Sequence, residues 1–389
     1  MRAGFRRYFG QAPAELAPML ARLSLLALGC NPASSEAHAQ PAGDGSAAQV
    51  ASAVAEVAAS ASSAPAASAE PVSAQAGSSG APRSHAGDGV VTLSAVGDCT
   101  LGDPAGSELA PGSFHDVLAK HGGDLAYPFS GVRALLEDDD LTIANLEGTL
   151  TTRAPRTDIP FAFRGRPEFA GMLPLGSVEL VALANNHMND CGPRGTDDTI
   201  AALEAEKVGY FGLGHVDKRT IDGVEVVNLG WTGGRDEILG EVQRAVRAHK
   251  RDENLVIVSF HWGIENEHAV NSVQLKLGRG AVDAGADLVL GHHPHVLQGI
   301  ETYEGRTIVY SLGNFVFGGN ARPAELDTVI FRARFAKRDG KVVELDHELV
   351  PVSVSGHRAQ NDFRPVPLEG SDAARVRENL ARYSASLPR

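Results

Sequence analysis

Apolar runs of strand length alternate with segments of helical spacing through most of the chain. The runs lie at residues 90–96, 141–144 and 287–290 and within "VELVAL", "VEVVNLGW" and "ENLVIVSF". Residues 196–206 and the stretch "SVQLKLGRGAVDAGA" have the spacing of helices. Strands alternating with helices predict βαβ units and a largely parallel sheet. Near the C-terminus, "DTVIFRARFA" and "KVVELDHELVPVSV" alternate like antiparallel strands. The predicted fold class is therefore α/β with mixed sheets.

Composition divides the chain into four parts. Residues 31–88 contain little except Ala, Ser, Pro and Gly, which is too little bulky apolar side chain to offset the entropy of ordering, so we expect a disordered linker. Residues 89–366 are long enough to form one domain with a sizeable core. Residues 367–389 form a C-terminal tail, in which "SDAARVRENLARYSAS" predicts a helix.

Residues 1–30 have the pattern of an export signal. Arg2, Arg6 and Arg7 precede a short apolar segment, "LSLLALGC", that ends at Cys30. This arrangement resembles a bacterial lipoprotein signal, which implies lipidation of Cys30 and a protein held on the periplasmic or extracellular face of a membrane, with residues 31–88 as spacer. A disordered leader or a misassigned start is the alternative.

The charge of the chain limits the partners we expect. A net charge of −13 and no clustered Lys/Arg face argue against a nucleic-acid binder, because phosphate backbones require basic surfaces. No run other than the N-terminal one approaches the length of a membrane span.

Side chains that can bind metal follow several predicted strands directly. In α/β sheets, ligands bind beyond the carboxyl ends of the strands, so we expect these side chains to converge. Imidazole, carboxylate and carboxamide groups together suit Mn, Fe or Zn, and two such ions could activate a water molecule and hold a phosphate oxygen. The predicted metal ligands are Asp98, Glu147, Asn186, His261, His293 and His295.

Six motifs in fixed order resemble those of the CapA capsule-synthesis, or poly-γ-glutamate biosynthesis, family. They are "AVGDCTLG", "ANLEGTL", "LANNHMNDCG", "SFHWGIENE", "GADLVLGHHPHVLQGIE" and "IVYSLGNFVF". That family is similar to the calcineurin-like metallophosphoesterases, so the resemblance implies a four-layer α/β/β/α sandwich with a dinuclear site. It also implies that Glu147 bridges two divalent ions and that His187 is the general acid.

Other residues near these motifs receive supporting roles. Asn185 and Asn145 are expected to orient their neighbours, and Asn314 to lie in a buried turn beside the site. His292 is expected to form a hydrogen bond near the ligands or to face solvent. The remaining candidates are Arg164, which could hold an anionic substrate group or lie on the surface, and Glu265, which could orient His261 or face water, as part of a rim with Trp262.

Several alternatives remain open at this stage. Many phosphoesterases carry histidine where this chain has Thr100, which puts the first metal position in question. Asp98 could cap a helix, His261 could be a hydrogen-bonded core residue, and His187 could be structural. We expect Cys99 and Cys191 to be small core residues, with a disulfide or metal-bound thiolates as alternatives.

Two functions of different class follow. The first is a dinuclear metal-dependent hydrolase of phosphoesterase type, linked by the resemblance to capsule or poly-γ-glutamate biosynthesis or export and to its machinery. An amide hydrolase with the same site is a variant of it. The second is a non-catalytic envelope assembly factor that binds an anionic polymer or a partner.

Overall fold

The computed structural model describes residues 89–159 and 161–388, and every structural statement below refers to them. They lie in a compact unit that spans Ala76–Arg389. Cys30, the predicted signal and the predicted linker lie outside the described residues. In the described part of the chain, no helix combines the length and apolar character needed to span a membrane.

The larger sheet has eight strands and contains the first three predicted strands side by side. Strands β1, β3, β6 and β7 are parallel, whereas β15, β16 and β17 run antiparallel. The order across the sheet is β17 (Val366–Pro367), β16 (Lys341–Ser353), β15 (Asp327–Arg338), β1 (Val90–Thr100), β3 (Leu141–Leu146), β6 (Leu180–Ala182) and β7 (Gly209–Phe211), and β14 (Asn314–Phe317) also pairs with β1.

A second sheet has six strands and a parallel centre formed by β9, β10, β11 and β13. Its order is β12 (Ile300–Tyr303), β13 (Arg306–Val309), β11 (Leu288–His292), β10 (Asn254–His261), β9 (Val224–Thr232) and β8 (Asp217–Ile221). A small third sheet is formed by β2 (Asp103–Pro104), β5 (Phe163–Gly165) and β4 (Thr149–Leu150).

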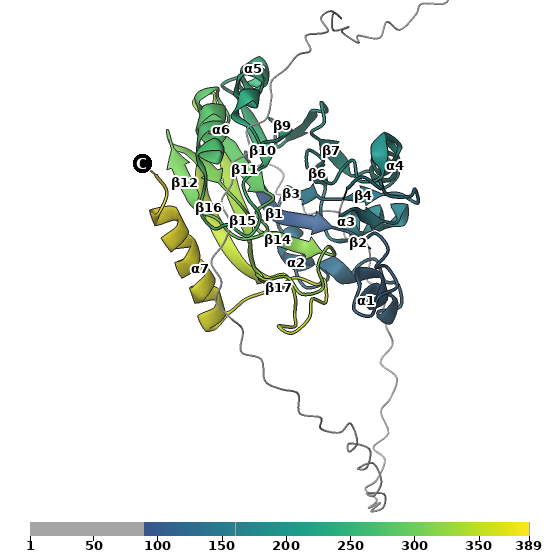
Figure 1. Ribbon diagram of the computed structural model, residues 1–389. Helices are drawn as coiled ribbons and strands as arrows, with labels where there is room; N and C mark the ends of the chain where they lie inside the picture. The colour runs from purple at the N-terminus through teal and green to yellow at the C-terminus, as the bar shows by residue number, and fades with distance from the viewer. Residues whose placement is uncertain (1–88, 160, 389) are drawn as a thin grey trace, which may run out of the picture. The chain divides into compact units, whose positions relative to one another are not determined.

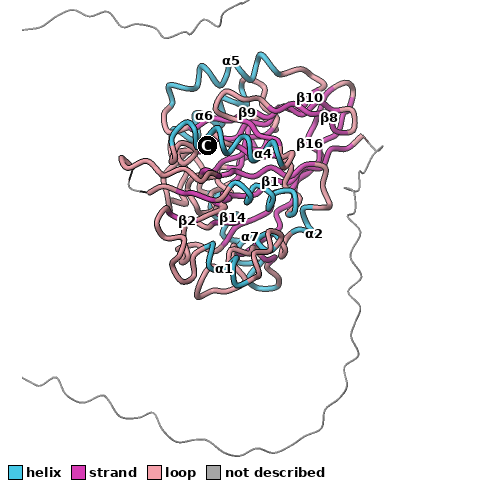
Figure 2. Tube along the Cα trace, turned by 90° about the vertical axis from the view of Figure 1, so that its right-hand side faces the viewer, coloured by secondary structure: helices cyan, strands magenta, loops and turns pink. Residues whose placement is uncertain are grey.

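Helices cover the outer faces of the two large sheets (Figure 1). The first group consists of α1 (Phe114–Lys120), α2 (Arg133–Leu136), α3 (Met172–Leu175) and α4 (Gly192–Ala205), with 3-10 turns η1 (Tyr127–Phe129) and η2 (Pro167–Gly171). The second group consists of α5 (Leu239–His249) and α6 (Ser272–Asp283), with η3 (Asp236–Ile238). In Figure 2, α5 and α1 lie at opposite ends, and strands fill the space between them.

The alternation of side chains along each strand explains the four layers. In β10, Leu255 and Ile257 point into the core between the sheets, whereas Val256 and Val258 point toward α5 and α6. In β1, Leu93 belongs to the core between the sheets, and Val96 lies in the core under the first helix group. The predicted α/β/β/α sandwich with mixed sheets is therefore confirmed.

The C-terminal helix is packed against the sandwich. Helix α7 (Gly370–Ala385) places Val376 and Leu380 in the core between the sheets. Arg375 pairs with the buried carboxylate of Asp327. The helix predicted in the tail is thus confirmed, and its apolar side chains are continuous with the domain core.

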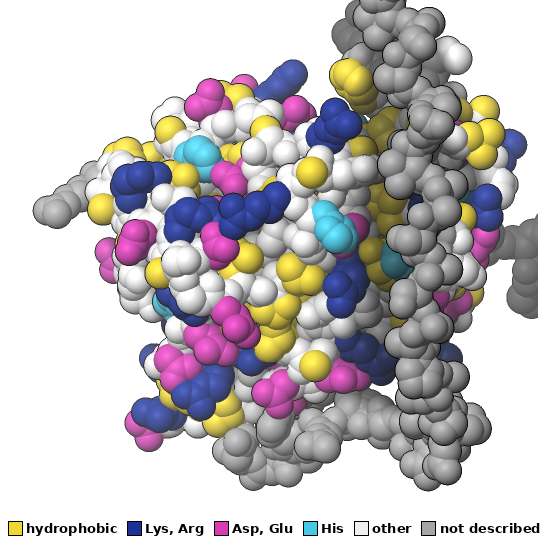
Figure 3. All heavy atoms as spheres, turned by 90° about the horizontal axis from the view of Figure 1, so that it is seen from below, with side chains coloured by type: hydrophobic (Ala, Val, Ile, Leu, Met, Phe, Trp, Pro, Cys, Tyr) yellow, Lys and Arg dark blue, Asp and Glu magenta, His cyan; other side chains and the backbone are white. Residues whose placement is uncertain are grey.

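The surface carries charges of both signs. Figure 3 shows one face of the molecule, on which Lys and Arg side chains lie interspersed with Asp and Glu side chains.

Candidate metal centre

Asp98 lies near the end of β1, at the centre of the larger sheet, and is fully buried. Its Oδ1 accepts a hydrogen bond of 2.9 Å from Asn145 Nδ2. The Nδ1 atoms of His292 and His295 lie 3.3 and 3.1 Å from its two oxygens. Burial raises the pKa of Asp98, but the contacts with these imidazoles lower it further, so the pKa lies well below its ordinary value. Asp98 is therefore an ionised carboxylate in the interior, and it does not cap a helix.

Glu147 directly follows β3, and neither of its carboxylate oxygens has a hydrogen-bond partner although both are buried. Its Oε1 lies 3.5 Å from His261 Nε2, 3.7 Å from His295 Nε2 and 3.9 Å from His187 Nε2. Burial raises the pKa of Glu147 well above its ordinary value, and the charge of Asp98 adds to this effect. An unpaired buried carboxylate costs several kcal/mol, roughly, unless a cation compensates it.

His261 ends β10 and therefore enters from the second sheet. Its Nε2 lies 2.6 Å from Oδ1 of the exposed Asn186, and its Nδ1 lies 3.3 Å from Asn145 Nδ2. Burial lowers the pKa of His261 well below its ordinary value, which keeps the imidazole neutral, the form that binds metals. Asn186 follows β6 of the larger sheet, so these two side chains join the sheets at the site.

The three neighbouring histidines are placed by the end of β11 and the turn after it. His292 is the last residue of β11, and His293 and His295 flank Pro294 with φ of 96° and 58°. These left-handed conformations are uncommon for histidine, which indicates that the fold holds both residues in place. His292 is 1% exposed, which rules out the solvent-facing alternative.

His295 is held by contacts on one side of its ring. Its Nδ1 lies 3.0 Å from Asn314 Oδ1 and 3.1 Å from Asp98 Oδ2. Because both partners are oxygen acceptors, Nδ1 carries a proton and Nε2 faces Glu147. Burial lowers the pKa of His295, but the carboxylates of Glu147 and Asp98 outweigh this effect and raise it to about 9.

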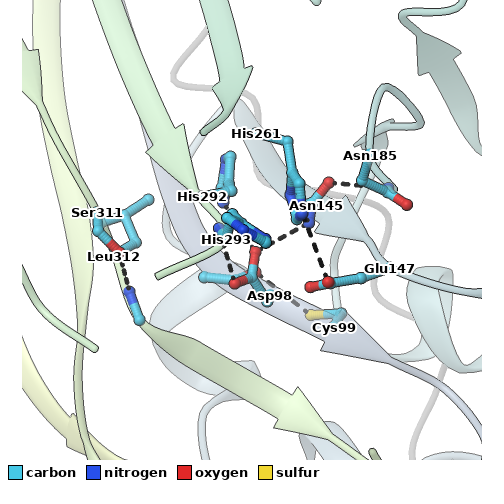
Figure 4. A network of polar contacts seen from close by, with 12 residues as sticks. Asp98, Cys99, Asn145, Glu147, Asn185, His261, His292, His293, Ser311 and Leu312 are labelled. Carbon is cyan, nitrogen blue, oxygen red and sulfur yellow. Dashed lines mark hydrogen bonds and ion pairs between the residues drawn. The ribbon is translucent and has the colours of Figure 1, made fainter. Parts of the chain in front are cut away.

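The arrangement fits divalent cations. Side chains form three overlapping groups of three, and within each group the ligand atoms lie within 4.8 Å of one another. Figure 4 shows Asp98, Glu147, His261 and His293 pointing toward one another. Both nitrogens of His292 and Nδ1 of His293 are buried without a hydrogen-bond partner. A cation would compensate the carboxylate of Glu147 and would be bound by the imidazole of His293, whereas His292 belongs to none of the candidate groups. The groups are Glu147, His261 and His293; Asp98, Glu147 and His295; and Glu265, His293 and His295.

His187 lies beside these groups and is oriented by a residue that sequence reasoning did not assign. Its Nδ1 lies 2.8 Å from Asp190 Oδ2, which also accepts a 2.6 Å hydrogen bond from the backbone N–H of Phe163. A carboxylate accepts, so His187 Nδ1 donates and Nε2 faces the site. Asp190 lies three residues after His187 in "NNHMND", and this spacing was the available signal.

Asparagines connect the site residues to one another. Asn145 Oδ1 accepts from Asn185 Nδ2 at 3.2 Å, and Asn185 Oδ1 accepts from the backbone N–H of His187 at 3.1 Å. Asn314 holds His295 through its side chain and lies beside Asp98 in the pairing of β14 with β1. These contacts support the orienting roles expected of Asn145, Asn185 and Asn314.

The structure decides between the alternatives for Arg164 and Glu265 and corrects the position expected of Trp262. The guanidinium of Arg164 binds Glu108 Oε1 at 2.5 Å and lines a different pocket. The structure therefore places it outside the cluster of ligands. Trp262 is not on a rim, because it is 1% exposed and donates to the carbonyl of Tyr310. Glu265 is exposed and lies near His293 and His295, whereas His261 has Asn145 and Asn186 as hydrogen-bond partners.

Cys99 and Cys191 are both free and buried, as expected for small core residues. Burial raises the pKa of the Cys99 thiol to about 12. Cys191 Sγ accepts a contact of 3.2 Å from Thr149 Oγ1. The alternative of a disulfide is therefore not supported.

A pocket of about 500 Å³ opens beside His187 and His295. Aromatic side chains to which the sequence analysis gave no role form part of its wall, among them Phe161, Phe163 and Phe317. They come from a loop and from short strands whose sequence does not differ from that of core strands, so no sequence signal distinguished them.

The layers and this site together define an α/β sandwich protein with a candidate metal centre between its two main sheets. Residues 92–319 match the bacterial capsule synthesis protein PGA_cap family, which is more than half of the chain, so the chain belongs to this family. The family resemblance of the six motifs is thereby confirmed.

The chain is similar to several curated relatives. It is 30% identical over 266 residues to the capsule biosynthesis protein CapA of Bacillus anthracis, with 61% of this chain and 62% of that protein covered. It is 28% identical over 254 residues to the PGA biosynthesis protein CapA of Bacillus subtilis, with 59% and 64% covered. It thus spans less than two thirds of the length of these two relatives.

Two further similarities complete the comparison. A probable polyglutamine synthesis accessory protein of Mycobacterium tuberculosis is 27% identical over 277 residues, with 61% of this chain and 72% of that protein covered. Among solved structures, the calcineurin-like phosphoesterase YfkN from Bacillus subtilis aligns with a TM-score of 0.43 at 14% identity, over 76% of this chain and 99% of that one.

Proposed function

We propose that this protein is a metal-dependent hydrolase of phosphoesterase type that binds two divalent ions and acts in capsule or poly-γ-glutamate biosynthesis. The observation that carries the proposal is Glu147. Its two buried oxygens have no hydrogen-bond partner, and its Oε1 lies within 3.9 Å of three imidazoles. The biological setting rests on the family and on the names of the relatives.

The side chains that would hold the ions come from both sheets. They are Asp98, Glu147, Asn186, His261, His293 and His295, with Mn, Fe or Zn as the cations that suit such donors. Ions bound there would supply an activated water molecule and would neutralise charge on a phosphate oxygen.

The residues of the chain itself would perform the proton transfer. Asp190 holds the Nδ1 proton of His187, so the imidazole presents Nε2 toward the pocket. A proton on Nε2 can be passed to the oxygen of a leaving group. Asn185 binds the backbone N–H of His187 and fixes the position of the imidazole relative to Glu147.

Metal content and turnover test this function directly. The protein purified without chelator is expected to contain about two divalent ions per chain by mass spectrometry. It is expected to hydrolyse bis(4-nitrophenyl) phosphate and to lose that activity on dialysis against a chelator, with recovery on addition of Mn²⁺. Protein that contains two ions and hydrolyses neither phosphoesters nor amides would contradict the proposal.

A second candidate function is a non-catalytic assembly factor, and Thr100 is the observation that favours it. Thr100 stands where many phosphoesterases have a histidine ligand, and its buried hydroxyl has no hydrogen-bond partner. Bound metal without turnover on any ester would support this function in place of the first.

We further propose that the protein is exported and anchored to a bacterial membrane through lipidation of Cys30. The charged start and the apolar "LSLLALGC" segment support this proposal. In cells supplied with a radiolabelled fatty acid, the wild-type protein is expected to be labelled and to sediment with membranes, and Cys30→Ala is expected to lose both properties. Cys99→Ala is the matched control. Membrane association of Cys30→Ala equal to that of the wild type would refute the anchor.

A further inference from the structure

The pocket beside the metal centre has a wall of aromatic side chains. Phe161 is 68% exposed and lines the pocket together with Phe163 and Phe317, whose ring centroids lie 6.3 Å apart in a T-shaped arrangement. The Phe163 ring lies 4.3 Å from His187, and the Phe317 ring lies 5.0 Å from His295. A ring bound against this wall would therefore adjoin both the proton donor and a candidate metal ligand.

Gly319 packs closely against two of these rings. A Cβ atom at this position would lie 3.0 Å from the Phe163 ring and 2.9 Å from the Phe317 ring. A side chain at this position would collide with both rings, so glycine allows the chain to pass this close to the aromatic wall.

The pocket has acidic side chains and no permanent cation. Among the described residues that line it, Asp190, Glu265 and Glu325 are acids, and none is lysine or arginine. Glu325 is held in place because its Oε1 accepts from the backbone N–H groups of Leu326 and Asp327, at 3.1 and 3.0 Å. Arg322 lies in the same loop but is not part of the lining.

The acidic lining of the pocket disfavours the binding of a polyanionic ligand. Histidines and bound cations can neutralise one anionic group at the inner end of the pocket. Further anionic groups would approach Glu265 and Glu325 within about one Debye length, roughly 8 Å at physiological salt, where like charges repel. A neutral ring would instead bury apolar surface against the phenylalanines.

We propose that this pocket binds a phosphoester with a single anionic group at the metal end and a neutral ring, aryl or sugar, against Phe161, Phe163 and Phe317. A polyanionic chain such as poly-γ-glutamate is excluded from the pocket. This inference rests on the proposed function, because it takes the inner end of the pocket as the position of the phosphoryl group.

Calorimetry on the metal-loaded full chain tests the ligand class without requiring turnover. Phenylphosphonate is expected to bind about tenfold more tightly than methylphosphonate, through burial of the ring. Glucose 1-phosphonate distinguishes a sugar from an aryl preference. Penta-γ-glutamate is expected to give no binding, and the double variant Glu265→Gln, Glu325→Gln is expected to acquire it.

Variants at exposed positions provide the controls. Phe161→Ala is expected to remove most of the preference for the phenyl ligand, whereas Leu109→Ala, an exposed apolar residue away from the pocket, and Arg322→Ala are expected to retain it. Equal affinity for phenyl- and methylphosphonate, or binding of penta-γ-glutamate by the wild type as tight as that of phenylphosphonate, would overturn the inference.

Turnover separates this inference from the proposed function. Selective binding of the ring ligand without hydrolysis of bis(4-nitrophenyl) phosphate would reject the hydrolase and retain the ligand class. Hydrolysis without ring selectivity would retain the hydrolase and reject the ligand class.

Discussion

Replacement of Glu147 by glutamine is expected to make the metal-free protein more stable and the metal-loaded protein less stable than the wild type. In the metal-free protein, the variant removes a buried carboxylate that lacks hydrogen-bond partners, which should gain about 1–3 kcal/mol. That gain corresponds to a rise in melting temperature of about 5 °C.

Metal would reverse the order of stability because only the wild type has a carboxylate at position 147 to hold the proposed ions. A ligand present at a hundredfold excess over its Kd stabilises the folded state by about 2.7 kcal/mol, and the variant should lose most of this gain. Thermal unfolding with chelator and with Mn²⁺ measures both effects.

The matched control is Asp139→Asn, which changes another buried carboxylate, hydrogen-bonded to Thr142 and outside the candidate metal groups. Its response to metal should equal that of the wild type. An unchanged metal-induced shift in Glu147→Gln would show that Glu147 does not contact the ions.

Replacement of His187 by alanine is expected to lower kcat by about 10²–10⁴-fold for an alkyl phosphodiester and far less for a 4-nitrophenyl ester. The reason is that an alkoxide requires a proton in order to leave, whereas 4-nitrophenolate leaves without one. Metal content should be unchanged, because His187 belongs to none of the candidate metal groups.

Asp190→Asn should show the same dependence on leaving group with a smaller loss, since it affects the orientation of His187 and not its presence. The control His215→Ala alters an exposed histidine outside the pocket and should be silent. Equal losses on both kinds of ester would remove His187 as the proton donor and would favour a structural role.

The sequence allowed much of the fold to be predicted because its strands are strongly apolar and short. The predicted strands at residues 90–96 and 141–144 correspond to β1 and β3, and the helix predicted at 196–206 overlaps α4 at Gly192–Ala205. The division into two sheets could not be read from periodicity, because the strands of both sheets are buried on both faces and have the same pattern. It came from the family resemblance.

The site was predicted in part for the same reason. The ends of strands carry Asp98, Glu147 and His261, so the apolar pattern of each strand predicts where these residues lie. The pairing of His187 with Asp190 and the burial of His292 depend on how turns fold back, which spacing does not specify. Arg164 alternates with Phe163 along β5, so only one of the two side chains can face the pocket, and the structure assigns that position to Phe163.

The candidate metal ligands come from two different sheets, and this affects when a cation can be captured. The candidate ligands Asp98, Glu147 and Asn186 come from the larger sheet, whereas His261, His293 and His295 lie later in the chain, at or just after the ends of β10 and β11 of the second sheet. A nascent or truncated chain that ends before residue 254 would contain half of the donors and no complete set. A cation held by both sets of side chains would therefore be captured only once both sheets are in place.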